Sequence, residues 1–163
     1  MKIKIITMGM LAMLSLSLTS CRESGCTDPN ADNYSATADK NTECRYRNAS
    51  NIDVSNVSTN KANGNPWDGS GDSPDLKINF GKSSSSGFDY STNTADNATT
   101  ATLTANTSVK FTNETWKYEL VDVDVLGSEV IASGTFNPLQ STTSNVIEIT
   151  SNGVTFKFKY TIQ

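Results

Sequence analysis

Nine residues near the C-terminus decide the fold class: Val154-Thr155-Phe156-Lys157-Phe158-Lys159-Tyr160-Thr161-Ile162. Every second residue is apolar, and the residues between are Thr or Lys. Because side chains alternate between the two faces of a strand, this pattern predicts a β-strand with one face in a core and one in water. Asn152-Gly153 stands just before it and predicts a two-residue hairpin turn from a strand over Val146–Thr150.

The same alternation recurs upstream. Trp116, Tyr118 and Leu120 alternate with Lys117 and Glu119, and short apolar runs separated by Asn, Gly, Pro and Ser cover most of residues 51–163. Seven or more short strands with polar turns indicate an antiparallel β-sandwich or barrel, and we expect an all-β sandwich of about eight strands. The remaining predicted strands are Ile52–Val57, Leu76–Phe80, Phe88–Tyr90, Thr100–Ala105, Ser108–Phe111 and Val130–Phe136.

Residues 1–20 have the features of a secretion signal. Lys2 and Lys4 precede the apolar run Ile5–Leu18, which is too short to span a bilayer core of about 30 Å. Leu18-Thr19-Ser20-Cys21 resembles the lipobox of bacterial lipoproteins. The resemblance implies removal of residues 1–20 and a lipid-anchored Cys21, whereas the alternative is an ordinary secretory signal followed by a coincidental cysteine. Arg22, rather than Asp, follows Cys21, which favours the outer membrane and leaves periplasmic or external display open.

Composition excludes several classes of function. Removing Lys2 and Lys4 with the signal takes the formal net charge from −4 to −6, which argues against nucleic acid as a partner. The sequence contains no histidine, so Ser-His-Asp and Cys-His catalysis and histidine-based zinc sites are excluded. A carboxylate pair such as Asp68 and Asp122 remains an alternative for glycoside hydrolysis. No aromatic sugar platform accompanies it, and we expect the protein not to be an enzyme.

Cys26 and Cys44 form an even pair once Cys21 carries lipid, and an exported compartment favours a disulfide between them. Such a bridge contributes roughly 3 kcal/mol in the chain-entropy model. The segment resembles a short cysteine-bracketed module of bacterial cell-surface proteins, with Cys-Thr-Asp-Pro, then Asn-Tyr, then acidic residues before the second Cys. We interpret residues 21–50 as the lipidated N-terminus and a disulfide-stapled spacer. The alternative is a calcium site built from Asp28, Asn30, Asp32, Asp39 and Glu43.

Acidic residues gather at two places far apart in the sequence. Asp68-Gly69-Ser70-Gly71-Asp72-Ser73-Pro74-Asp75 stands directly before the strand that begins at Leu76. Asp122 and Asp124 stand at alternate positions after Leu120 and so continue the same face of its strand. A carboxylate on a core face is costly without a partner. Either the strand therefore ends near Val121, or the site is open and filled by a cation.

The order of these clusters resembles the C2 domain family. In that family an Asp, a Gly-rich turn and a second Asp precede a strand, and a later strand ends in Asp-x-Asp. Here the first strand begins with Leu76-Lys77-Ile78, and the later one ends in Asp122-Val123-Asp124. A further acidic residue precedes a segment like Val130-Ile131-Ala132, and a Pro-Leu pair follows, here Pro138-Leu139. The resemblance covers residues 51–163 and implies a C2-like calcium-binding domain. The ligands that it implies are Asp68, Asp75, Asp122, Asp124 and Glu129, with Asp72 able to replace a neighbour.

We therefore expect a lipid-anchored cell-envelope protein with a non-enzymatic calcium module. Through its metal-bearing loops it would bind a membrane surface, a glycan or a protein partner. Val125 and Leu126 would be apolar residues at a loop tip, able to touch lipid or a partner or to pack into the loop itself. The alternative is a structural or adhesive β-sandwich without metal.

Overall fold

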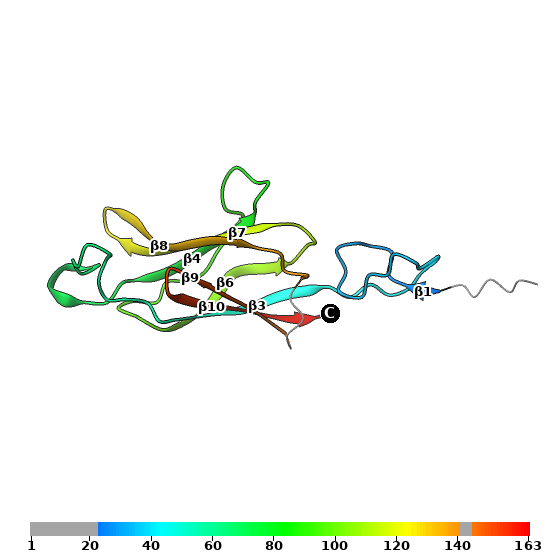
Figure 1. Ribbon diagram of the computed structural model, residues 1–163, viewed down its shortest axis with the longest axis horizontal. Helices are drawn as coiled ribbons and strands as arrows, with labels where there is room; N and C mark the ends of the chain where they lie inside the picture. The colour runs from blue at the N-terminus through cyan, green and yellow to red at the C-terminus, as the bar shows by residue number, and fades with distance from the viewer. Residues whose placement is uncertain (1–22, 141–144) are drawn as a thin grey trace, which may run out of the picture.

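The computed structural model describes residues 23–140 and 145–163, so the predicted secretion signal and Cys21 lie outside the described residues. Two antiparallel sheets of four strands pack face to face (Figure 1). The predicted all-β sandwich is confirmed. No helix in the described part of the chain is long and apolar enough to cross a membrane.

The first sheet contains the alternating C-terminal strand. Its order is β6-β3-β10-β9, so the C-terminal strand lies in the interior of the sheet. Asn152 and Gly153 have φ angles of 50° and 80° and join the last two strands, which confirms the predicted hairpin. The strands are β3 (Arg47–Ser55), β6 (Ala101–Lys110), β9 (Val146–Ser151) and β10 (Val154–Ile162).

The second sheet carries the acidic residues. Its order is β5-β4-β7-β8, and β7 is therefore a central strand. The register places Leu76 and Glu129 on either side of Asp122. The short 3-10 turn η1 (Gly69–Gly71) precedes this sheet in the chain. The strands are β4 (Leu76–Lys82), β5 (Tyr90–Ser91), β7 (Trp116–Asp124) and β8 (Gly127–Phe136).

Several strand boundaries differ from the expectation: β3 begins at Arg47 instead of Ile52, β5 covers Tyr90–Ser91 instead of Phe88–Tyr90, and β8 begins at Gly127 instead of Val130. The segments predicted as two strands, Thr100–Ala105 and Ser108–Phe111, form the single strand β6, whose pairing with β3 shifts register between Ala49 and Asn51. The break expected between the two segments is therefore an irregularity of pairing within one continuous strand. Strand β7 also continues through Asp124, so the reading in which it ends near Val121 is wrong.

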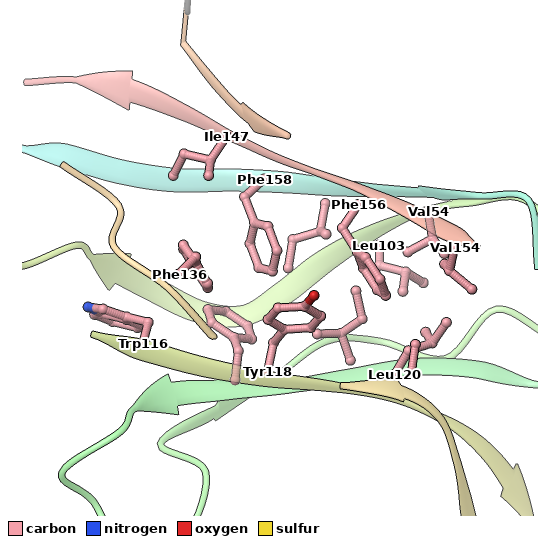
Figure 2. Packing of buried hydrophobic residues seen from close by; sticks show 14 of the residues in the cluster. Val54, Leu103, Trp116, Tyr118, Leu120, Phe136, Ile147, Val154, Phe156 and Phe158 are labelled. Carbon is pink, nitrogen blue, oxygen red and sulfur yellow. The ribbon is translucent and has the colours of Figure 1, made fainter. Parts of the chain in front are cut away.

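Alternating apolar residues from both sheets fill the space between them (Figure 2). Tyr118 on β7 contacts Phe156 on β10, with ring centroids 4.8 Å apart, and Phe136 on β8 lies 4.6 Å from Phe158. These four rings are at most 9% exposed. Burial of these side chains stabilises the sandwich, at about 25 cal/mol per Å² of apolar surface. The core fixes the direction of β7 and thus the position of the residues at its end.

A separate small unit precedes β3. Its strands β1 (Ser24–Gly25) and β2 (Lys40–Asn41) pair in parallel, and Cys26 is bonded to Cys44. The predicted disulfide is thus confirmed. We call residues 23–46 the stapled module.

Candidate metal centre

Three carboxylates that are far apart in the sequence meet at one end of the sandwich. Asp68, Asp122 and Asp124 each offer an oxygen, and these oxygens lie within 4.8 Å of one another. Asp68 stands directly before η1, while Asp122 and Asp124 stand at the end of β7. The hairpin turn between β7 and β8 lies at the same end of the molecule (Figure 1). We call these three residues and that turn the acidic pole.

Asp122 is the most unusual member. It has no solvent-exposed surface, because it continues the core face of β7 beyond Leu120. One oxygen, Oδ1, accepts a hydrogen bond of 2.8 Å from the backbone N–H of Asp75. The other, Oδ2, has no partner within the described residues. Burial raises the pKa of Asp122, although the hydrogen bond from Asp75 opposes the shift.

Asp68 shares the unfavourable environment. Partial burial raises the pKa of Asp68, and the neighbouring carboxylates of Asp122 and Asp124 raise it further. A group of like charges held together in this way costs free energy unless a proton or a cation neutralises it. The electrostatic strain therefore belongs to the group and not to one residue.

The other acidic residues of the expected ligand set have different positions. Asp75 lies close enough to influence the charges of the group, but its Oδ1 accepts a hydrogen bond of 2.8 Å from the backbone N–H of Asn97. Glu129 is exposed and forms an ion pair with Lys61. Asp72 is exposed, beyond η1. None of the three belongs to the group of oxygens that meet within 4.8 Å.

Lys61 is a residue of this region that the sequence did not single out. Its ammonium group holds Glu129, and that contact raises the pKa of Lys61. The nearby positive charge also opposes the rise in the pKa of Asp122. Lys61 is the only charged residue between Asp53 and Asp68, which could have marked it in the sequence. Only the structure shows that it lies across from Glu129.

The acidic residues of the stapled module do not form a comparable group among the described residues. Asp28 accepts hydrogen bonds from Asn30 and from the hydroxyl of Tyr46, and Asp32 accepts one from Arg47. Their oxygens are thus engaged in contacts that hold the module together and to its surroundings. This arrangement agrees with a structural role for the module.

The donor set of the acidic pole fits calcium. Calcium takes six to eight hard oxygen ligands, often from carboxylates that bind through both oxygens. Three carboxylates offer up to six oxygens, and the unpartnered Oδ2 of Asp122 needs a partner that is positive or donates a proton. The other buried side-chain atom without a partner in the described residues, Nε1 of Trp116, is neutral. A divalent cation would satisfy the group at a single point.

The turn beside the centre is apolar. Val125 and Leu126 connect β7 to β8 and are 101% and 99% exposed, so neither packs into its own loop. Two adjacent aliphatic side chains that are fully exposed have no role in the core. They project from the same turn that follows Asp124.

Comparisons with known proteins address the fold. No family model matches the sequence, and no curated protein matches it. A solved structure named BON1-C2B matches with a TM-score of 0.54 and 10% sequence identity, over 73% of this chain and 92% of that chain. At this identity the likeness concerns the fold alone. The domain therefore has a C2-like β-sandwich fold.

Proposed function

We propose that this protein is a lipid-anchored, non-enzymatic binding protein whose acidic pole binds calcium and then an anionic phospholipid surface. The observation that carries the proposal is the buried carboxylate of Asp122, which has an unpartnered oxygen and faces two further carboxylates. A charge buried in this way is retained at a cost, and a cation offsets that cost.

Asp68, Asp122 and Asp124 would hold the cation, which supplies positive charge and open coordination positions. Extracellular calcium modules often have dissociation constants of about 10⁻⁴–10⁻³ M. Calcium at about ten times the Kd would stabilise the fold by about 1.4 kcal/mol, provided that the unfolded chain does not bind it. This response is small but measurable.

The apolar turn supports phospholipid as the partner. Phosphate oxygens can complete the coordination shell of a calcium ion held by carboxylates, while Val125 and Leu126 enter the interface between headgroups and acyl chains. Burying one aliphatic side chain of this size contributes about 1.5–3 kcal/mol. Calcium coordination and burial of the two aliphatic side chains would therefore contribute to binding at the same surface.

A glycan is less well supported. A groove of about 570 Å³ beside the acidic pole contains Trp67, the aromatic residue that would stack against a sugar ring. The ammonium of Lys61 lies 5.4 Å from the centroid of the Trp67 ring and covers that face. The indole N–H is also committed, since it donates to the carbonyl of Ser58. We therefore favour a lipid surface over a sugar.

The membrane anchor and the cellular location are parts of the same proposal. Leu18-Thr19-Ser20-Cys21 supports diacylglycerol on Cys21, and Arg22 in place of Asp supports residence at the outer membrane. Both residues lie outside the described part of the chain. Mass spectrometry of the exported protein should find the chain starting at Cys21 with added acyl chains. A mature chain that begins elsewhere, or an unmodified Cys21, would exclude the anchor.

Calorimetric titration of the soluble chain (residues 22–163) tests the calcium step. We expect binding that EDTA reverses and that Asp122→Asn abolishes. Asp96→Asn, an exposed aspartate outside the cluster, removes the same charge and should bind as the parent chain does. No heat of binding at several millimolar calcium, about the weak end of the range for extracellular modules, would leave a metal-free structural sandwich.

A further inference from the structure

The acidic pole and the stapled module lie at opposite ends of the molecule. Figure 1, drawn with the longest axis horizontal, shows β1 at one end and the turn between β7 and β8 near the other. The module continues into the sandwich through Arg47, the first residue of β3, with no linker between them. The direction in which the acidic pole faces therefore depends on how firmly the module is held.

Arg47 fixes the module to the base of the sandwich. Its side chain is largely buried, with Nε donating to Asp32 of the module at 2.6 Å and Nη1 to the carbonyl of Pro138 at 2.6 Å. The guanidinium also lies 4.6 Å from the ring centroid of Tyr160. A planar cation that joins these partners in fixed directions restricts rotation of one unit against the other.

Further contacts surround this anchor. Tyr46 exchanges two backbone hydrogen bonds with Gln163, of 2.6 Å and 3.0 Å, which extends the pairing of β3 and β10 beyond Ile162. The hydroxyl of Tyr46 donates to Asp28 at 2.8 Å. Asn30 accepts a hydrogen bond of 3.0 Å from the backbone N–H of Asn113, in the loop before β7. The stapled module is thus a fixed pedestal of the sandwich.

The chain leaves little slack between this pedestal and the proposed anchor. Only Arg22 stands between Cys21 and Glu23, so the anchor lies within roughly 7 Å of Glu23 at about 3.5 Å per residue. Strand β7 has nine residues and spans roughly 30 Å from the base to the acidic pole. The apolar turn can enter a membrane end-on only when the long axis stands upright on it. In that pose Glu23 lies far from the same membrane.

We infer that the acidic pole faces away from the membrane that holds the N-terminus, so that calcium joins this membrane to a second, anionic phospholipid membrane. The inference rests on the proposed function and adds the geometry of the partner. The molecule would then act as a calcium-dependent tether between two lipid surfaces.

A fluorescence experiment can distinguish the two membranes. Val125→Trp places a reporter in the exposed turn and keeps the turn apolar. The full lipidated chain, with acylation checked by mass, is inserted into nanodiscs that contain phosphatidylcholine and phosphatidylserine. Vesicles of the same lipids are then added with calcium or with EDTA. Brominated phosphatidylcholine, which quenches tryptophan on contact, is present either in the nanodiscs or in the vesicles.

We expect calcium to cause quenching of the tryptophan fluorescence only when the brominated lipid is in the added vesicles. A control variant carries about thirty Gly and Ser residues inserted between Arg22 and Glu23. This linker adds a root-mean-square reach of about 30 Å, so the tryptophan should be quenched by brominated lipid in either membrane. Quenching of the original chain by bromine in its own nanodisc would overturn the inference and leave the proposed function intact. If the soluble chain shows no calcium-dependent vesicle binding, the proposed function fails and the inference fails with it.

Discussion

Asp122 shows how one residue can oppose the packing around it. It occupies a core position of β7, on the face formed by the buried side chains of Trp116, Tyr118 and Leu120. One of its carboxylate oxygens has no partner among the described residues. The packing of the aromatic core and the pairing of the strands offset the destabilisation that a buried carboxylate causes. Under the proposed function, this residue would lower the stability of the metal-free protein in exchange for calcium binding.

Asp122→Asn should stabilise the metal-free protein at neutral pH. The amide keeps an oxygen for the N–H of Asp75, loses the buried charge and can donate to the neighbouring carboxylates. We expect a gain of about 1–3 kcal/mol in the free energy of unfolding, measured by urea denaturation in EDTA. Asp96→Asn serves as the control and should change it by less than about 0.5 kcal/mol. A less stable Asp122→Asn chain would show that the charge is already compensated.

The pH dependence follows from the raised pKa of Asp122. The folded pKa lies above the unfolded value of 3.8, so the folded chain binds more protons in between, and this destabilising contribution shrinks as the pH falls. The advantage of Asp122→Asn over the parent chain in EDTA should therefore decrease as the pH falls from 7 towards 4. Paired denaturation curves across that range measure the difference directly. An advantage that stays constant would contradict a shifted Asp122.

At the scale of elements, the β7–β8 hairpin combines two chemistries. The strand end carries Asp122 and Asp124, and the turn that follows carries Val125 and Leu126. Because the turn makes no core contacts, it can be changed without affecting the fold. The proposed cation site and the apolar turn can therefore be separated by mutation.

Replacing both Val125 and Leu126 by Ser should abolish vesicle binding and spare calcium binding. The loss of two exposed aliphatic groups removes about 3–6 kcal/mol of possible lipid burial, whereas the three carboxylates remain. Calcium-dependent sedimentation with phosphatidylserine vesicles should fall to the level found with EDTA. Calorimetry should still record calcium binding. Unchanged sedimentation would show that the turn does not contact lipid.

At the scale of the molecule, the stapled module and the sandwich behave as one unit because Arg47 joins them. The disulfide closes the module internally, whereas Arg47 and Tyr46 connect it to β10 and to the loop after β8. Since β3 begins at Arg47, the strand starts inside the segment expected as a spacer, residues 21–50. The overall shape therefore depends on a few polar contacts at the base.

Arg47→Ala should loosen the pedestal. The substitution leaves Asp32 and the carbonyl of Pro138 without their donor, at a cost of about 1–3 kcal/mol. Limited proteolysis should cut between residues 23 and 46 faster than in the parent chain, while the sandwich fragment remains intact. Arg47→Lys keeps the charge but cannot hold both partners, so its cleavage rate should fall in between. Equal rates for all three chains would indicate that Arg47 does not hold the module.

The sequence by itself determined the all-β sandwich, the C-terminal hairpin and the disulfide. Period-two alternation, an Asn-Gly turn and an even pair of cysteines are local signals that do not depend on distant contacts. The composition also excluded histidine-based catalysis. These conclusions needed only the order of residues.

Only the tertiary structure decided which carboxylates meet. The two acidic clusters were visible in the sequence, but register and loop paths brought Asp68, Asp122 and Asp124 together, turned Asp75 towards Asn97 and paired Glu129 with Lys61. The continuation of β6 and β7 was also decided by pairing with neighbouring strands. The physical reason is that the burial of a carboxylate and its distance from other charges depend on contacts across the sandwich. The local sequence pattern does not determine these contacts.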